Sequence, residues 1–225
     1  MPRSTVPFNQ SFLRAAVVSL IAGSSFVLSA ATLPNPPVDE NRDKKSETVV
    51  LAGGCFWGVE AVFDSVKGVS DAVSGYAGGN KTTAHYDIVS TGTTGHAESV
   101  QITYDPSQIS FGQLLKIYFS VVHDPTELNR QGPDEGTQYR SEIFYTSEEQ
   151  KHIAEAYIQQ LSAAKSFSRP IVTKVAPLQG FYAAEDYHQD FVLKNPHQPY
   201  VARNDVPKVA RLHQEFPELV KGGKQ

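Results

Sequence analysis

A single cysteine, Cys55, is the feature that most constrains how this chain folds. One thiol forms neither an intramolecular disulfide nor a structural zinc site built on two or more thiolates. Stability must therefore come from a hydrophobic core, and 225 residues with 40% hydrophobic side chains can build one or two domains. The 20 basic and 24 acidic residues form no basic stripe, so we expect no sequence-independent binding to nucleic acid.

The N-terminal residues 1–31 have the pattern of a secretory signal peptide. Arg3 and Arg14 supply positive charge, residues 15–28 form an apolar run, and residues 29–31 are the small residues of a cleavage site. The apolar run is shorter than the ~20 residues that a membrane-spanning helix needs. We therefore expect an exported protein, periplasmic or secreted, with an uncleaved membrane anchor as the alternative.

Composition divides the rest of the chain into three parts. Residues 32–47 begin rich in proline and end charged, which predicts a flexible linker because such a segment buries little apolar surface. We expect one folded domain at 48–200 and a C-terminal extension at 201–225.

Hydrophobic periodicity within this domain predicts alternating strands and helices without a strict βα repeat. Helices packed on a mainly antiparallel sheet, an α+β fold, fit that pattern best. The expected strands are 48–52, 69–74, 99–104, 143–145 and 171–176, the expected helices are 56–65, 110–122, 147–165 and 183–193, and a flexible glycine-rich loop is expected at 75–79.

Cys55 follows a short apolar strand and the turn Gly53-Gly54, at the first turn of the helix expected at 56–65. Unpaired N–H groups and the positive end of the helix dipole favour a thiolate at such a position. An unpaired cysteine in an exported protein also indicates a reactive thiol. The other interpretation is a buried, inert cysteine, which is the usual state of a free thiol.

Glu98 precedes the strand expected at 99–104 and shares the even-numbered face with Val100 and Ile102. If the strand extends back to it, the carboxyl group points toward apolar surroundings. Burial would then raise its pKa and suit it to act as a general acid near neutral pH. A solvated glutamate at the end of a strand is the alternative.

Several short motifs are distributed over about residues 48–200. They are Gly53-Gly54-Cys55-Phe56-Trp57-Gly58, Gly75-Tyr76-Ala77-Gly78-Gly79, Gly95-His96-Ala97-Glu98, Tyr104-Asp105-Pro106, His123-Asp124-Pro125, Gly136-Thr137-Gln138-Tyr139-Arg140-Ser141 and Ala184-Glu185-Asp186-Tyr187-His188-Gln189. Together, and in this order, they resemble the A-type peptide methionine sulfoxide reductases, one of two enzyme types that each reduce one sulfoxide epimer.

The resemblance implies a two-layer sandwich of ferredoxin-like type and seven site residues. Cys55 would be the nucleophile and Glu98 the proton donor. Tyr86 and Tyr139 would bind the sulfoxide oxygen. Phe56 and Trp57 would form the methyl pocket, and Asp134 would supply a further polar group.

The resemblance further implies reduction of the S epimer of methionine sulfoxide, free or in proteins, through a sulfenic acid on Cys55. Many family members resolve this acid with additional C-terminal cysteines, which this chain lacks. We therefore expect an external thiol as the reductant, either a thioredoxin-like protein or glutathione with glutaredoxin. We expect no bound cofactor or metal, and a monomer.

Two other functions are compatible with parts of the sequence. A cysteine-dependent hydrolase or acyltransferase would need a histidine base near Cys55, chosen from His85, His96, His123 and His188. A secreted binding module would use Phe56, Trp57 and the tyrosines as a recognition surface, and its thiol would be dispensable.

Overall fold

The computed structural model describes residues 1–2 and 32–222, so the expected signal peptide lies, from residue 3 onward, outside the described residues. Within residues 32–222, six strands form one sheet in the order β7-β6-β1-β3-β2-β8 and two more form a short ribbon. The sheet strands are β1 (Glu47–Gly53), β2 (Val69–Ala77), β3 (Ala97–Tyr104), β6 (Ser141–Tyr145), β7 (Lys174–Pro177) and β8 (Phe181–Ala183); the ribbon is β4 (Arg130–Gln131) with β5 (Asp134–Glu135).

The four central strands have the ferredoxin-like arrangement. β1 lies between β6 and β3, and β3 pairs with β2, all in antiparallel register. One helix connects β1 to β2 and another connects β3 to β6, which is the β-α-β-β-α-β order. β7 is the exception, because it pairs in parallel with β6 after a crossover helix. The expected α+β fold with a mainly antiparallel sheet is confirmed.

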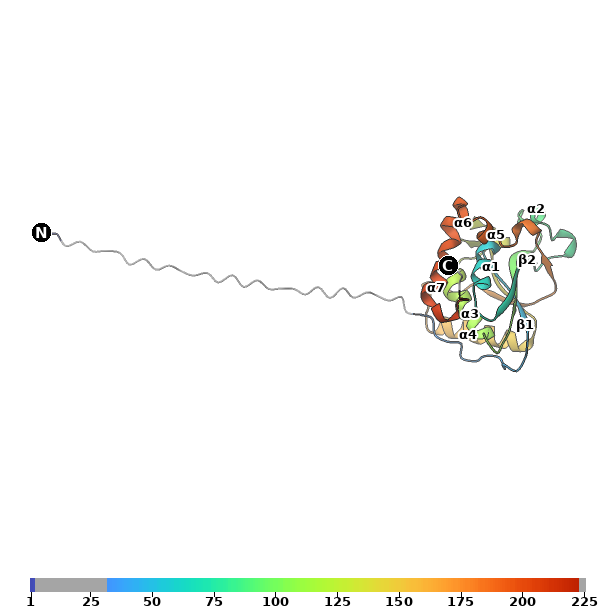
Figure 1. Ribbon diagram of the computed structural model, residues 1–225, viewed down its shortest axis with the longest axis horizontal. Helices are drawn as coiled ribbons and strands as arrows, with labels where there is room; N and C mark the ends of the chain where they lie inside the picture. The colour runs from blue at the N-terminus through green and yellow to red at the C-terminus, as the bar shows by residue number, and fades with distance from the viewer. Residues whose placement is uncertain (3–31, 223–225) are drawn as a thin grey trace. The chain divides into compact units, whose positions relative to one another are not determined.

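Helices cover one face of this sheet (Figure 1). They are α1 (Phe56–Asp64), α2 (Tyr86–Val89), α3 (Phe111–Ile117), α4 (Glu148–Ala163), α5 (Phe191–Lys194), α6 (Pro199–Asn204) and α7 (Val206–Glu215). The main hydrophobic core lies between α1, α3, α4 and the sheet, whereas the opposite face carries only a small apolar cluster around Phe144. None of the helices described is long and apolar enough to cross a bilayer.

Helix α3 starts where the sequence predicts, because its capping box forms. The Ser110 hydroxyl accepts a hydrogen bond from the Gln113 N–H (3.2 Å), and the Gln113 side chain accepts one from the Ser110 N–H (3.1 Å). The regular helix ends at Ile117, earlier than expected, and residues 118–122 continue as a π-helical turn. All five residues of that turn are buried, so packing determines its backbone path.

Strand β2 continues into the residues expected to form a flexible loop at 75–79. Gly75 pairs with Ser99 on one side and with Ala183 of β8 on the other. A Cβ atom on Gly75 would lie 2.4 Å from the carbonyl oxygen of Tyr182, so glycine is needed for β8 to come this close. The loop prediction is therefore wrong for the first three residues of this segment.

The prediction of a helix at 183–193 is also wrong. This part of the chain forms β8, a 3-10 turn and the short helix α5. The Gln189 side chain bonds both backbone groups of Ser74 on β2 (3.0 Å each), and Asp190 adopts a left-handed φ of 55°. These tertiary bonds hold the backbone away from a continuous helix.

The segment 32–47 packs on the domain and does not behave as the expected linker. Glu40 is 7% exposed and accepts hydrogen bonds from the Phe111 N–H (2.5 Å) and from the Tyr104 hydroxyl (3.0 Å). Asp39 likewise bonds to the first turn of α3. These carboxylates accept hydrogen bonds from N–H groups that have no partner inside the helix. The acidic residues that predicted a linker from the sequence therefore attach this segment to the start of α3.

The residues expected as a C-terminal extension, 201–225, also belong to the domain as far as residue 222, where the described residues end. Val201 and Leu212 are fully buried, and Val66 forms an isolated antiparallel bridge with Val220. The folded domain therefore extends beyond the expected boundary and includes α6 and α7.

Candidate active site

Cys55 is the N-cap residue of α1, at the end of the turn that leaves β1. Gly54 in this turn has a φ of 91°, and a Cβ atom there would lie 2.6 Å from Gln131. Both the positive φ and the lack of space for a Cβ atom require glycine at this position. The turn places Cys55 against the core, where its exposed fraction is 8%.

Glu98 lies directly beside this turn. Strand β3 begins at Ala97, so the alternation predicted from the sequence holds and the carboxyl group faces inward, 2% exposed. Its Oε2 accepts a hydrogen bond from the Phe56 N–H (3.1 Å) at the start of α1. Burial raises the pKa of Glu98 to about 8, which the bond to Phe56 offsets in part. The expected burial of this carboxyl group is confirmed, and burial favours the protonated acid near neutral pH.

The Cys55 thiol has a pKa well above its usual value, which contradicts the expected thiolate. Burial is the main cause, and the neighbouring carboxyl groups of Glu98 and Asp205, when they are ionised, add to it. The Trp57 N–H at the helix start favours the thiolate, but it offsets only part of this cost. The thiol and the carboxylic acid therefore both hold their protons near neutral pH.

Both groups line one cavity of about 270 Å³. The cavity brings together all seven residues proposed from the sequence, together with two that were not: Cys55, Phe56, Trp57, Tyr86, Glu98, Asp134 and Tyr139, with Gln198 and Tyr200. The chemical role of each residue stays a prediction, whereas their shared location is an observation.

Two phenol groups supply further donors to this cavity. Tyr86 begins α2, and its N–H is held by the Glu185 carboxylate (3.0 Å). Tyr139 lies in the 3-10 turn before β6. Burial raises the pKa of both phenols above the ordinary value, so each hydroxyl keeps its proton and can donate to a polar ligand.

Phe56 and Trp57 form the aromatic wall of the cavity, and neighbouring aromatic rings hold both side chains in place. Trp57 stacks on Phe191 with ring centroids 3.8 Å apart, and its indole N–H donates to His188 Nδ1 (3.1 Å). The same imidazole packs on Phe56 at 5.0 Å. Because burial lowers the pKa of His188, the ring stays neutral and can accept this bond.

Sequence reasoning missed three contributors to the site. Tyr200 and Gln198 line the cavity from the chain around α6, and the Tyr200 hydroxyl donates to Asp134 Oδ2. Both lie at the expected edge of the domain, where the sequence offered no periodic signal. His188 belongs to a segment already noted for its resemblance to the reductase family, but its contact with Trp57 depends on the tertiary fold.

The arrangement provides no histidine base for a hydrolase. Among the described residues, no histidine lines the cavity. His123 is buried, lies 2.6 Å from the Ser141 hydroxyl, and burial lowers its pKa to about 3. Nδ1 of His188 accepts the Trp57 indole N–H, and the ring lies behind the aromatic wall and does not line the cavity.

Comparisons with known proteins point to one family. The family model described as peptide methionine sulfoxide reductase matches residues 47–219. A peptide methionine sulfoxide reductase from Mesorhizobium japonicum is 60% identical over 182 residues, covering 81% of this chain and 93% of the relative. A second, from a Synechocystis species, is 51% identical over 207 residues, covering 89% of this chain and 97% of the relative.

Solved structures give the same result. The crystal structure of reduced Mxr1 from Saccharomyces cerevisiae superposes with a TM-score of 0.61 at 34% identity, covering 72% of this chain and 92% of that one. Methionine sulfoxide reductase A of Corynebacterium diphtheriae has a TM-score of 0.59 at 35% identity, covering 75% of this chain and 87% of that one.

Proposed function

The chain belongs to the peptide methionine sulfoxide reductase family, and we propose that it reduces methionine sulfoxide to methionine in the cavity around Cys55. This activity makes it an oxidoreductase. The observation that carries the assignment to this cavity is the pairing of a thiol with a buried, protonated carboxylic acid beside an aromatic wall. A sulfoxide needs this combination, because a polar oxygen projects from an otherwise apolar thioether.

Substrate binding follows from the surfaces of the cavity. The methyl group of the sulfoxide packs on Phe56 and Trp57. Its oxygen accepts hydrogen bonds from Glu98, Tyr86 and Tyr139, which all carry protons near neutral pH. These donors stabilise the negative charge that develops on oxygen as the reaction proceeds.

In the chemical step the Cys55 sulfur attacks the sulfoxide sulfur while Glu98 gives its proton to the oxygen. The thiol proton leaves the sulfur and returns to the Glu98 carboxylate. The attack joins the two sulfur atoms. The protonated oxygen then moves from the substrate sulfur to the Cys55 sulfur, so the sulfur–oxygen bond of the substrate and the new sulfur–sulfur bond both break as an oxygen–sulfur bond to Cys55 forms. Methionine is released, and Cys55 is left as a sulfenic acid. Cysteine is oxidised and the sulfoxide is reduced, so atoms and electrons balance.

The second half of the cycle needs an external thiol, because Cys55 is the only cysteine in the chain. A first thiol condenses with the sulfenic acid to give a mixed disulfide and water, and a second releases Cys55 as a thiol and leaves as a disulfide. A thioredoxin-like protein or glutathione with glutaredoxin can supply both equivalents. No bound cofactor takes part in this scheme.

A single-turnover experiment on the full chain tests the proposal. The reduced protein is mixed with resolved S and R methionine sulfoxide without reductant, and methionine release is followed together with the protein mass. We expect one equivalent of methionine from the S epimer, one added oxygen atom on Cys55, and repeated turnover when dithiothreitol is present. Cys55→Ser should release none.

The outcomes separate the three candidate functions. Retained reductase activity in Cys55→Ser removes the nucleophile assignment. Cleavage of esters or amides without sulfoxide reduction supports a hydrolase, and binding without any chemistry supports a recognition module.

We also propose that the protein is exported and acts as a monomer. The first 31 residues support export, because they combine a basic start, an apolar run and small residues at a cleavage position. The mass of the mature protein and its elution on size exclusion test both statements. An intact N-terminus or a dimer would contradict them.

A further inference from the structure

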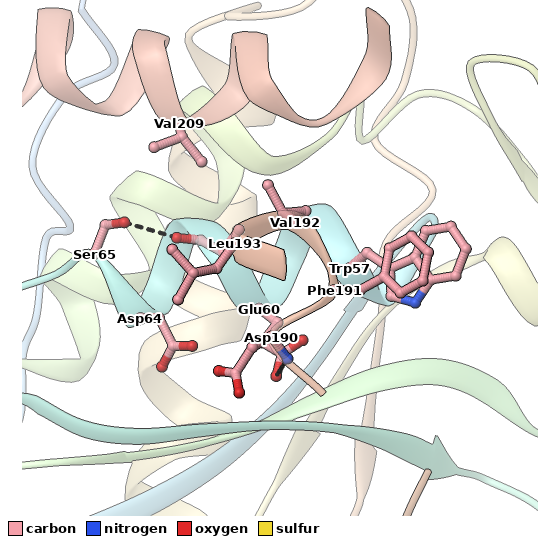
Figure 2. Close-up of a pocket in the computed structure, with 10 residues that line it drawn as sticks. Trp57, Glu60, Asp64, Ser65, Asp190, Phe191, Val192, Leu193 and Val209 are labelled. Carbon is pink, nitrogen blue, oxygen red and sulfur yellow. Dashed lines mark hydrogen bonds between the residues drawn. The ribbon is translucent and has the colours of Figure 1, made fainter. Parts of the chain in front are cut away.

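A second cavity, of about 280 Å³, lies along the outer face of α1 (Figure 2). Trp57 lines both this cavity and the one around Cys55, and Phe191, which stacks on the indole, lines this cavity beside it. Its other apolar lining residues are Ala61, Phe191, Val192, Leu193 and Val209. Leu193 is 80% exposed, which leaves a large apolar side chain uncovered at the rim.

This groove follows the helix away from the reaction site. Trp57, Ala61 and Asp64 lie four and then three residues apart, which places them on one face of α1. At 1.5 Å per residue, the distance along the helix from Trp57 to Asp64 is about 10 Å. An extended peptide covers that distance in about three residues.

Three carboxylates line the groove, those of Glu60, Asp64 and Asp190, and among them Asp64 lies farthest from Trp57 along α1 (Figure 2). One oxygen from each lies within 4.8 Å of the others. Asp190 is paired with Lys194 at 3.1 Å on the solvent side, and Lys221 partly offsets the charge of Asp64. Burial and mutual repulsion still raise the pKa of Glu60 to about 7 and of Asp64 to about 6. A cationic group placed here would relieve that repulsion.

We propose that this groove binds a lysine or arginine side chain of a polypeptide substrate, about three residues from its methionine sulfoxide. The aliphatic stem would lie on Trp57, Phe191 and Leu193, and the charged head would reach Asp64 and Asp190. Trp57 then borders both sites: it packs on the sulfoxide methyl in the reaction site, and Phe191, stacked on the indole, carries the neighbouring side chain in the groove.

The inference rests on the proposed function and adds a preference among its substrates. Free methionine sulfoxide has no flanking residue and does not reach the groove. Its reduction therefore reports on the reaction site alone, and the difference between peptide and free substrate reports on the groove.

Matched peptides test the proposal with the full chain and dithiothreitol. Each acetylated peptide carries one methionine sulfoxide and one variable residue at two to four positions on either side, either lysine, norleucine or glutamate. At the best position we expect kcat/KM for lysine to exceed that for norleucine about three- to tenfold, with glutamate lowest. The difference should appear in KM, because the groove does not touch the reacting atoms.

Variants show whether the carboxylates cause the preference. Asp64→Asn with Asp190→Asn should bring the lysine and norleucine peptides within about twofold of each other and leave free methionine sulfoxide unchanged. Glu148→Gln, an exposed carboxyl on α4 outside the groove, is the control and should keep the preference.

Two outcomes would overturn the proposal. They are equal kcat/KM for all three peptides at every position, and a preference that survives in the double variant. Failure to reduce free methionine sulfoxide would instead refute the proposed function.

Discussion

Replacing Glu98 with glutamine tests how burial prepares this site for chemistry. The glutamine side chain keeps the shape of the glutamate and can still accept the Phe56 N–H, so the start of α1 should remain intact. It removes only the ionisable group. Because the folded protein holds that group protonated and the unfolded chain does not, the substitution should change how stability depends on pH.

The size of the effect follows from the pKa. Burial raises the pKa of Glu98 from its ordinary value of 4.5 to about 8, and at 1.36 kcal/mol per pH unit this costs about 5 kcal/mol of folding free energy at high pH. At about pH 4 both states hold the proton and the cost is absent. Between the two pKa values the unfolded chain releases the proton first, so stability falls as pH rises, and above about pH 8 the loss is constant.

Urea unfolding at several pH values from about 4 to 9 measures this effect. Glu98→Gln should match the wild type near pH 4 and exceed its stability by about 5 kcal/mol near pH 9. Glu148→Gln, which removes a carboxyl that is 81% exposed, should show no such divergence. If the difference between Glu98→Gln and wild type is the same at every pH, the carboxyl is not held protonated by burial.

The same variant should lose activity while it gains stability. Without the acid, single-turnover reduction of free methionine sulfoxide should slow about 10²- to 10⁴-fold. Undiminished turnover in a stable Glu98→Gln protein would show that another group protonates the oxygen. A gain in stability with a loss of rate is the trade-off expected of a carboxyl retained for function.

Three further predictions follow from the same geometry. At about pH 7, iodoacetamide should modify Cys55 at least about tenfold more slowly than free cysteine, as measured by mass spectrometry, and a rate equal to that of free cysteine would contradict a protonated, buried thiol. Tyr86→Phe and Tyr139→Phe should each lower kcat/KM for free methionine sulfoxide about tenfold with little change in the urea midpoint; unaltered kinetics would exclude these hydroxyls from the oxygen site. Glu40→Ala should lower the free energy of unfolding by about 1–3 kcal/mol because the Phe111 N–H loses its partner, whereas a loss under about 0.5 kcal/mol would be typical of a true linker.

Local patterns in the sequence were enough to predict the positions of Cys55 and Glu98 in the candidate active site. A strand, a glycine turn and a helix start place Cys55 correctly, since each depends on residues adjacent in the chain. The alternation along β3 places Glu98 on the inner face for the same reason. The capping box of α3 formed as predicted, because it joins residues only three apart.

Contacts between segments that are distant in the sequence could not be predicted from such local patterns. The side chain of Gln189 bonds to β2, the carboxylate of Glu40 caps α3, and Tyr200 closes the cavity onto Asp134. None of these pairings has a signature in the sequence near either partner. The predictions of a helix at 183–193 and of a linker at 32–47 failed where a tertiary bond replaced the local preference. The prediction of a C-terminal extension failed because residues such as Val201 and Leu212 are buried in the domain.

The sequence by itself determined the fold class, the thiol and the acid, because hydrophobic periodicity and turn chemistry act over a few residues. Only the tertiary structure decided the protonation of Cys55. A helix start favours the thiolate, but the strength of burial and the charges of Glu98 and Asp205 depend on which distant segments surround the sulfur. Desolvation is set by the whole packed domain, and here it outweighs the local field of the helix.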